Sequence, residues 1–165
     1  MKRIVVCDTG PLLHLSEAGA IHLLQNAGQI LIPESVTKEF NQNAQGWNPP
    51  QWIEVHKLNK AAQKHSTEFI ESNTVDWGEA EAIALAIQVK ADWFVTDDAK
   101  ARQLAESLRL ESHGSIGILL WNLAVEKING EQARYMLDAL ADSSLWISNR
   151  VLYEARRAID MLTSN

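Results

Sequence analysis

The sequence contains a single cysteine, Cys7, among its 165 residues. One cysteine excludes an intrachain disulfide and fits a reducing, cytoplasmic environment. No apolar run approaches the roughly 18–20 residues that a membrane-spanning helix needs, and the longest candidate, 116–125, is interrupted by Gly117 and Asn122. The basic start, MKRIVV, has too short an apolar run for a signal peptide. We therefore expect a cytoplasmic protein with no membrane partner.

The sequence also has fewer basic than acidic residues. Lys and Arg total 15 against 21 Asp and Glu, which gives a formal net charge of −6. This balance excludes a protein that coats nucleic acid through bulk charge. It does not exclude a nucleic-acid enzyme whose acids are concentrated in a metal site, because bound cations would offset them. The five histidines share no spacing typical of metal ligands.

Short apolar runs alternate with segments of helical periodicity. We expect strands at 3–7, 29–33, 53–58, 92–98 and 110–113, and helices at 11–28, 34–40, 61–72, 75–91, 99–110, 116–128, 130–141 and 149–162. This alternation predicts an α/β fold with a central, mainly parallel sheet of four or five strands and helices on both faces. The length suits a single domain, 1–165, with a helical C-terminal extension from about 115 to 165.

Carboxylates stand where two of these strands end. Asp8 closes the first strand in RIVVCDTGPL, and Asp97 and Asp98 close the strand in FVTDDAKAR. Ligands bind beyond the carboxyl ends of parallel strands, so we expect these acids to meet at one edge of the sheet. Each could instead cap a helix or shape a turn. A single cap, however, needs only one of two adjacent acids.

Two helices supply further acids. In VDWGEAEAIALA, Asp76 and Glu79 match a capping box, which leaves a structural interpretation open for Glu79, whereas Glu81 has no such explanation. Glu39, in ESVTKEF, could equally lie on a solvated helix face. Carboxylate oxygens suit Mg²⁺ or Mn²⁺ rather than zinc. We expect such a cation to be held by members of the set Asp8, Glu39, Glu79, Glu81, Asp97 and Asp98.

Taken together, VVCDTGPLLHL, IPESVTKEF, DWGEAEAIALA and FVTDDAKAR resemble the PIN domain, the metal-dependent nuclease fold of VapC-type toxins. The later segments HGSIGILLWNLAVEKI and LWISNRVLYEA are similar to a prokaryotic PIN-like subfamily, and the resemblance extends to about residue 155. It implies a three-layer fold and an endoribonuclease that uses Mg²⁺ or Mn²⁺, with RNA as substrate and an antitoxin protein as a partner of the toxin form.

By position, the resemblance assigns the catalytic acids to Asp8, Glu39, Glu81 and Asp98. The third of these is Glu where many toxins have Asp, and the longer side chain would shift the metal. The candidate substrate-binding residues are the threonines beside the acids and two cations on the following helix: Thr9, Thr96, Lys100 and Arg102.

Two other functions remain open. One is a PIN-like protein that binds nucleic acid or a partner with little catalysis. The other is a phosphotransfer enzyme with Asp8 as nucleophile, although the Lys and Ser or Thr that this chemistry needs are not evident at other strand ends. We also expect a homodimer, because SIGILLWNLAVEKI is apolar over most of its circumference and the following amphipathic helices would cover only part of it.

Overall fold

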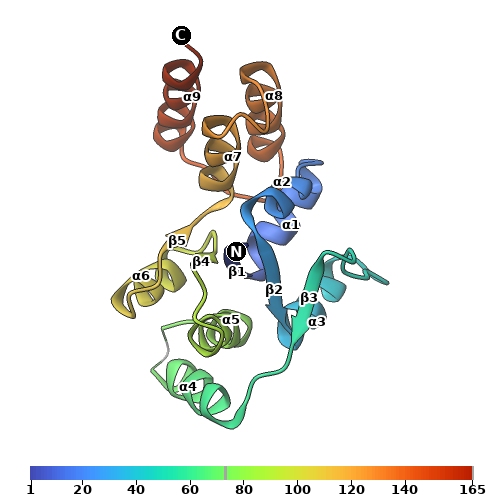
Figure 1. Cartoon of the computed structure of the whole chain (residues 1–165), viewed down its shortest axis with the longest axis vertical. Helices are drawn as coiled ribbons and strands as arrows, with labels where there is room; N and C mark the ends of the chain where they lie inside the picture. The colour runs from blue at the N-terminus through green and yellow to red at the C-terminus, as the bar shows by residue number, and fades with distance from the viewer. Residues whose placement is uncertain (73, 165) are drawn as a thin grey trace.

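The computed structural model describes residues 1–72 and 74–164. Five strands form one all-parallel sheet in the order β3-β2-β1-β4-β5 (Figure 1). They are β1 (Ile4–Cys7), β2 (Gln29–Pro33), β3 (Ile53–His56), β4 (Trp93–Val95) and β5 (Ser112–His113). The predicted α/β class and parallel sheet are confirmed. Because β1 and β4 are neighbours with Cys7 opposite Val95, the residues that follow them emerge side by side.

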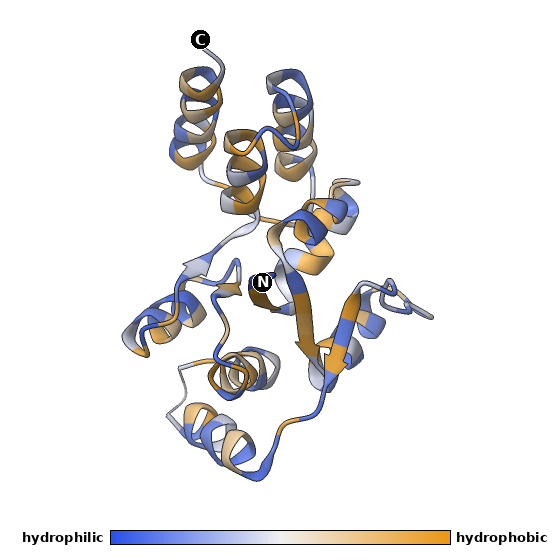
Figure 2. Ribbon diagram, viewed as in Figure 1, coloured by the Kyte–Doolittle hydropathy of each residue, from blue (hydrophilic) through white to orange (hydrophobic). Residues whose placement is uncertain are grey.

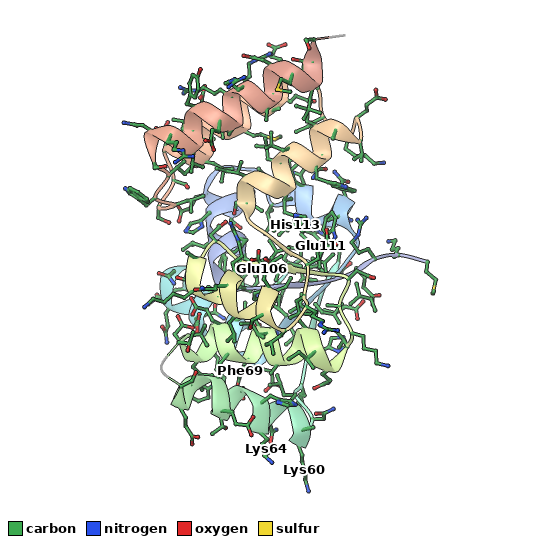
Figure 3. All side chains as sticks on the ribbon, turned by 90° about the vertical axis from the view of Figure 1, so that its left-hand side faces the viewer. Lys60, Lys64, Phe69, Glu106, Glu111 and His113 are labelled. Atoms are coloured by element: carbon green, nitrogen blue, oxygen red, sulfur yellow. The ribbon has the colours of Figure 1, made fainter. Side chains whose placement is uncertain are left out.

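The helices of the described residues cover both faces of this sheet. They are α1 (Thr9–Glu17), α2 (His22–Ala27), α3 (Glu34–Asn43), α4 (Lys60–Glu71), α5 (Trp77–Gln88), α6 (Ala99–Ser107), α7 (Ser115–Ala124), α8 (Gly130–Ala141) and α9 (Asn149–Thr163). Helix α5 packs on one face with α4 outside it, while α2 and α7 lie on the other with α8 and α9 outside α7 (Figure 1). Figure 3 shows α4, with Lys60 and Lys64, at the end of the molecule opposite α9.

The core lies between the sheet and these two helical layers. Val5 and Val6 of β1 are fully buried, as are Ile83 and Leu85 of α5 and Ile118 of α7. The apolar colouring of the central strands in Figure 2 follows the same pattern. Strands that are covered on both faces have to be apolar almost throughout, which explains the uninterrupted runs in the sequence. None of the helices formed by residues 1–72 and 74–164 has the length and apolar content needed to cross a membrane.

Two predicted elements differ from the structure in ways that have a clear local cause. The helix expected over 11–28 is two helices, because the chain turns at Gly19, which has a φ of 68°, a value that favours glycine. The strand expected over 92–98 has only three residues, since Asp98 already caps α6. A capping side chain, Asp98, decides the second boundary, whereas the backbone at Gly19 decides the first, because α2 begins without a side-chain cap.

Helix α7 is covered more completely than its sequence suggested. It packs against α2, α8, α9 and β5 of the same chain. Its apolar side chains Ile118, Leu119 and Leu123 are buried there. The argument for self-association through α7 therefore loses its support, and the exposed apolar side chains at this end of the molecule lie mainly on α8 and α9.

Candidate metal centre

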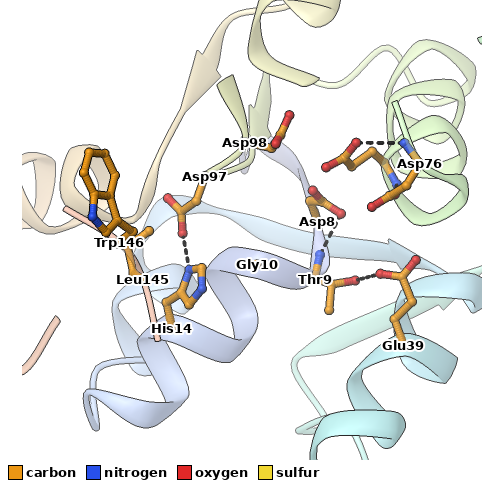
Figure 4. A pocket seen from close by; sticks show the side chains of 11 residues that line it. Asp8, Thr9, Gly10, His14, Glu39, Asp76, Asp97, Asp98, Leu145 and Trp146 are labelled. Carbon is orange, nitrogen blue, oxygen red and sulfur yellow. Dashed lines mark hydrogen bonds and ion pairs between the residues drawn. The ribbon is translucent and has the colours of Figure 1, made fainter. Parts of the chain in front are cut away.

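A cavity of about 420 Å³ opens beyond the carboxyl ends of β1 and β4 (Figure 4). Six of its lining residues are acidic: Asp8, Glu39, Asp76, Glu79, Asp97 and Asp98. The others are Thr9, Gly10, His14, Leu145 and Trp146, so no Lys or Arg of the described residues lines it. Acids that are distant in the sequence thus share one concave surface that strongly favours a cation.

Asp8 lies at the floor of this cavity, and only 4% of it is exposed. It caps α1: Oδ1 accepts a hydrogen bond from the Thr9 backbone N–H at 2.8 Å, and Oδ2 accepts one from Thr96 Oγ1 at 3.1 Å. Burial, helped by the nearby Glu79 carboxylate, raises the pKa of Asp8 to about 8 despite the Thr9 hydrogen bond. Because each carboxylate oxygen can accept more than one hydrogen bond, capping fixes the group without exhausting it.

The Asp97–Asp98 pair divides into two roles. Asp98 caps α6 by accepting from the Ala101 N–H at 2.8 Å. Asp97 accepts from the Ser115 N–H at 2.7 Å and from Ser115 Oγ at 2.6 Å, and it lies 2.7 Å from His14 Nδ1. Burial alone would raise the pKa of Asp97, but the hydrogen bonds from His14 and Ser115 hold it below its usual value. Asp97 therefore ties α1, β4 and α7 together at the cavity wall.

Glu39 reaches the cavity from α3. Its Oε2 accepts a hydrogen bond of 2.7 Å from Thr9 Oγ1, so the carboxylate is tied to the residue next to Asp8. Burial raises the pKa of Glu39, the Thr9 hydrogen bond opposes this, and the Asp76 and Glu81 charges add to the rise. A Cβ atom at Gly78 would overlap the Glu39 carboxylate. Glycine at position 78 is thus what lets Glu39 lie against the first turn of α5.

The first turn of α5 carries the predicted capping box. Asp76 accepts from the Glu79 N–H at 2.9 Å, and the Asp76 N–H donates to Glu79 Oε2 at 3.0 Å. Residues three apart share a helix face, so both acids line the cavity. Glu81 is two residues beyond Glu79, about 200° further round the helix. It lies outside the cavity, accepting a hydrogen bond from Trp77 Nε1 at 2.6 Å. The structure therefore gives Glu79, not Glu81, the place beside Asp8.

The candidate substrate-binding residues are distributed differently. Thr9 and Thr96 are buried and hold acids, as described above. Lys100 is exposed on α6 and is not among the cavity's lining residues. Arg102 Nη2 donates to the Thr96 carbonyl at 3.2 Å, and this side chain lines a neighbouring groove. The threonines thus support the acids, and only Arg102 lies on a concave surface next to them.

Two residues of the lining with titratable side chains, Asp76 and His14, were not proposed as site residues from the sequence. The capping box explained Asp76 fully, and only the helical period after Glu79 could have placed both acids on one face. Nothing in the local sequence of His14 connects it to Asp97, 83 residues away. That contact arises from the pairing of β1 with β4.

The carboxylates that line the cavity are suitable ligands for a hard divalent cation. Carboxylate oxygens are the ligands that Mg²⁺ and Mn²⁺ prefer. Burial raises the pKa of Glu79 to about 7, and the charges of Asp76, Asp98 and Glu39 contribute to the rise. Within residues 1–72 and 74–164, no three Asp, Glu, His or Cys side chains stand close enough to hold an ion as they are. Binding would thus require side-chain rotation, which the two glutamates allow.

These pKa values predict how stability depends on pH without divalent cations. A carboxyl whose pKa is higher in the folded state than in the unfolded state binds more protons when folded, so stability falls as the pH rises between the two values. For Asp8 this window runs from the model-peptide value near 4 to about 8. We expect the free energy of unfolding in EDTA to fall by roughly 3–4 kcal/mol from pH 5 to pH 8 through the Asp8 carboxyl alone. Urea denaturation measures this free energy. An increase from pH 5 to pH 8 would show that the pKa of Asp8 is not raised in the folded protein.

A family model described as a PIN domain matches residues 4–161. No curated protein matches the sequence. The matched range contains every acid that lines the cavity, as well as the helices from α7 to most of α9.

Proposed function

The chain belongs to the PIN-domain family, whose members are generally nucleases, and we propose that it is an endoribonuclease that depends on Mg²⁺ or Mn²⁺. One observation supports this most: acids from the ends of β1 and β4 and from α3 and α5 converge on one cavity. Such a site suits hydrolysis of RNA phosphodiester bonds, in which charge develops on oxygen atoms.

In this proposal, Asp8, Glu79 and Asp98 would hold the cation, with Glu39 beside them. A bound divalent cation lowers the pKa of a water molecule and stabilises the leaving oxygen. Thr9 and Thr96 keep the Asp8 carboxylate oriented, and Thr9 also fixes Glu39. Asp97 keeps its hydrogen bonds to Ser115 and maintains the cavity wall. Glu81 accepts a hydrogen bond from Trp77 and does not line the cavity, so its role as a ligand stays a prediction.

Cleavage of a labelled single-stranded RNA tests this function. We expect cleavage with Mn²⁺ or Mg²⁺, none in EDTA, and no hydrolysis of p-nitrophenyl phosphate, a substrate for phosphomonoesterases. RNA that stays intact with both cations would contradict the proposal and favour a binding protein with little catalysis. Hydrolysis of the phosphomonoester would favour the phosphotransfer alternative.

The biological setting is part of the same proposal. We place the enzyme in the cytoplasm, where its RNA substrate is found. The resemblance to VapC-type toxins supports a role as the toxin of a toxin–antitoxin pair, with the antitoxin as a protein partner. The family match supports nuclease chemistry in general, and the toxin role stays a prediction.

We further propose that the chain forms a homodimer through the outer surface of α8 and α9. Tyr135, Tyr153 and Met161 on these helices are each more than 60% exposed. These side chains lie on two helices that pack against each other, and exposed apolar patches mark interfaces. Light scattering at micromolar concentration should give about twice the 18.4 kDa monomer mass. Replacing Tyr153 with Asp should return the monomer mass, and a monomer for the unaltered chain would contradict the proposal.

A further inference from the structure

Two tryptophan side chains are unusually exposed for their size. Trp146 is 84% exposed and Trp77 is 65% exposed. The other four of the six tryptophans pack against the core: Trp47, Trp52, Trp93 and Trp121. Trp47 stacks on Phe40, and Trp93 meets Trp121 edge to face. An indole left in water loses the burial energy that the other four obtain, which points to a binding role for these two.

Trp146 stands at one edge of the carboxylate cavity (Figure 4). It also lines a groove of about 490 Å³ that shares Asp97 and Leu145 with the cavity and continues to Arg102. The loop that carries it is held in place: Ser144 donates from its N–H and its Oγ to Glu17 at 2.6 and 2.7 Å. The indole is therefore presented on a fixed support beside the acids.

Trp77 occupies the corresponding position on the other side. It is the first residue of α5, directly after Asp76, which Figure 4 shows across the cavity from Trp146. It lines a groove of about 540 Å³ that shares Glu39 and Asp76 with the cavity. The hydrogen bond from its Nε1 to Glu81 fixes one edge of the ring. The cavity and the two grooves thus adjoin one another and share lining residues at both junctions, and together we call them the depression.

The charges along this depression indicate how a nucleic acid would bind. Each groove contains one cationic side chain, Arg102 on one side and Lys38 on the other, while six carboxylates lie between them. A chain with a formal net charge of −6 gains little from phosphate contacts. Stacking of a base on an aromatic ring does not depend on net charge. A nucleic-acid strand that crosses this cavity therefore needs the binding energy of base stacking, which does not depend on charge.

We propose that Trp77 and Trp146 are base-stacking platforms on the two sides of the bond to be cut, and that the bound strand is unpaired RNA. A duplex hides the base faces in its own stack, so it cannot use either ring. The proposal rests on the nuclease function proposed above, and it adds the residues that select and position the substrate. It also predicts an affinity that depends only weakly on salt, since few phosphates are neutralised.

Binding of a fluorescein-labelled mixed-sequence RNA of ten nucleotides to the Asp8→Asn protein in EDTA tests the proposal without cleavage. Trp146→Ala and Trp77→Ala should each raise Kd roughly 5- to 150-fold, as expected for loss of one stacked base. Trp146→Phe should retain most of the affinity. Ile70→Ala, which removes an exposed apolar side chain on α4 that lines neither the cavity nor the two grooves, is the matched control and should leave Kd unchanged. Thermal melting confirms that each variant is folded.

Two further probes decide what the rings recognise. The same strand with abasic sites, and the same strand annealed to its complement, should both bind as weakly as the alanine variants. Equal affinity for intact and abasic strands, or equal Kd for Trp146→Ala and Ile70→Ala, would overturn the proposal. Because binding is measured without metal, tryptophan-dependent binding without cleavage would refute only the nuclease function. Cleavage without tryptophan dependence would refute only the stacking platforms.

Discussion

Replacing Asp8 with Asn is expected to lower metal-dependent RNA cleavage at least about 100-fold, since loss of a neighbour of a metal ligand alone costs 10- to 100-fold. The same substitution should raise the stability of the protein at pH 8 in EDTA. Burial raises the pKa of Asp8 to about 8, so about half of the molecules carry a buried negative charge there. Removing it relieves both the desolvation and the repulsion from Glu79.

Asn can keep the local hydrogen bonds. Its Oδ1 can still accept from the Thr9 N–H, and Asn caps a helix about as well as Asp. Its amide can donate to the Thr96 hydroxyl, which has two lone pairs. The gain in stability should be about 3–4 kcal/mol at pH 8, which is the linkage loss of the Asp8 carboxyl, and should vanish at pH 5, where the native carboxyl is already protonated.

Urea denaturation at the two pH values and a cleavage assay with Mn²⁺ measure these effects. Asp142→Asn, which alters an exposed acid at the end of α8, is the matched control and should change neither quantity. A large loss of stability in Asp8→Asn would mean that Asp8 is needed mainly as a cap. Cleavage at the unaltered rate would exclude Asp8 from the metal centre.

The sequence predicted the parallel sheet and the meeting of Asp8 with Asp97 and Asp98 because these depend on strong local signals. Uninterrupted apolar runs mark buried strands, and acids directly after them must reach the same edge once the strands are parallel. The sequence did not show which of Glu79 and Glu81 lines the cavity. That depends on the rotation of α5 about its axis, which packing against β1 and β2 fixes.

Contacts between distant segments left even less trace in the sequence. The hydrogen bond between His14 and Asp97 requires the register of β1 against β4. The position of Trp146 requires the return of the chain after α8 to the edge of the cavity, where Ser144 meets Glu17. The local sequence around His14 or around Ser144 does not indicate the residue that each contacts. Both contacts therefore become visible only in the folded chain.

The substitution Gly78→Ala should affect stability and activity in opposite directions. Gly78 lies in the first turn of α5, where its φ is not in the left-handed region, so alanine can adopt the same backbone. Replacing glycine by alanine inside a helix stabilises it by up to about 1 kcal/mol. The added Cβ would overlap the carboxylate of Glu39. That carboxylate is the end of a flexible side chain, so it should swing away and lose its hydrogen bond to Thr9 while the fold stays intact.

We therefore expect Gly78→Ala to keep or raise the melting temperature while lowering cleavage roughly 10- to 100-fold, the usual effect of losing a residue that positions a metal ligand. Calorimetric titration should show weaker Mn²⁺ binding. The matched comparison is the Glu39→Ala background, in which there is no carboxylate to displace, so adding Gly78→Ala should remove no further activity. Additive losses in the double variant would show that Gly78 acts on something other than Glu39. Unchanged cleavage in the single variant would show that the position of Glu39 against α5 is not required for the reaction.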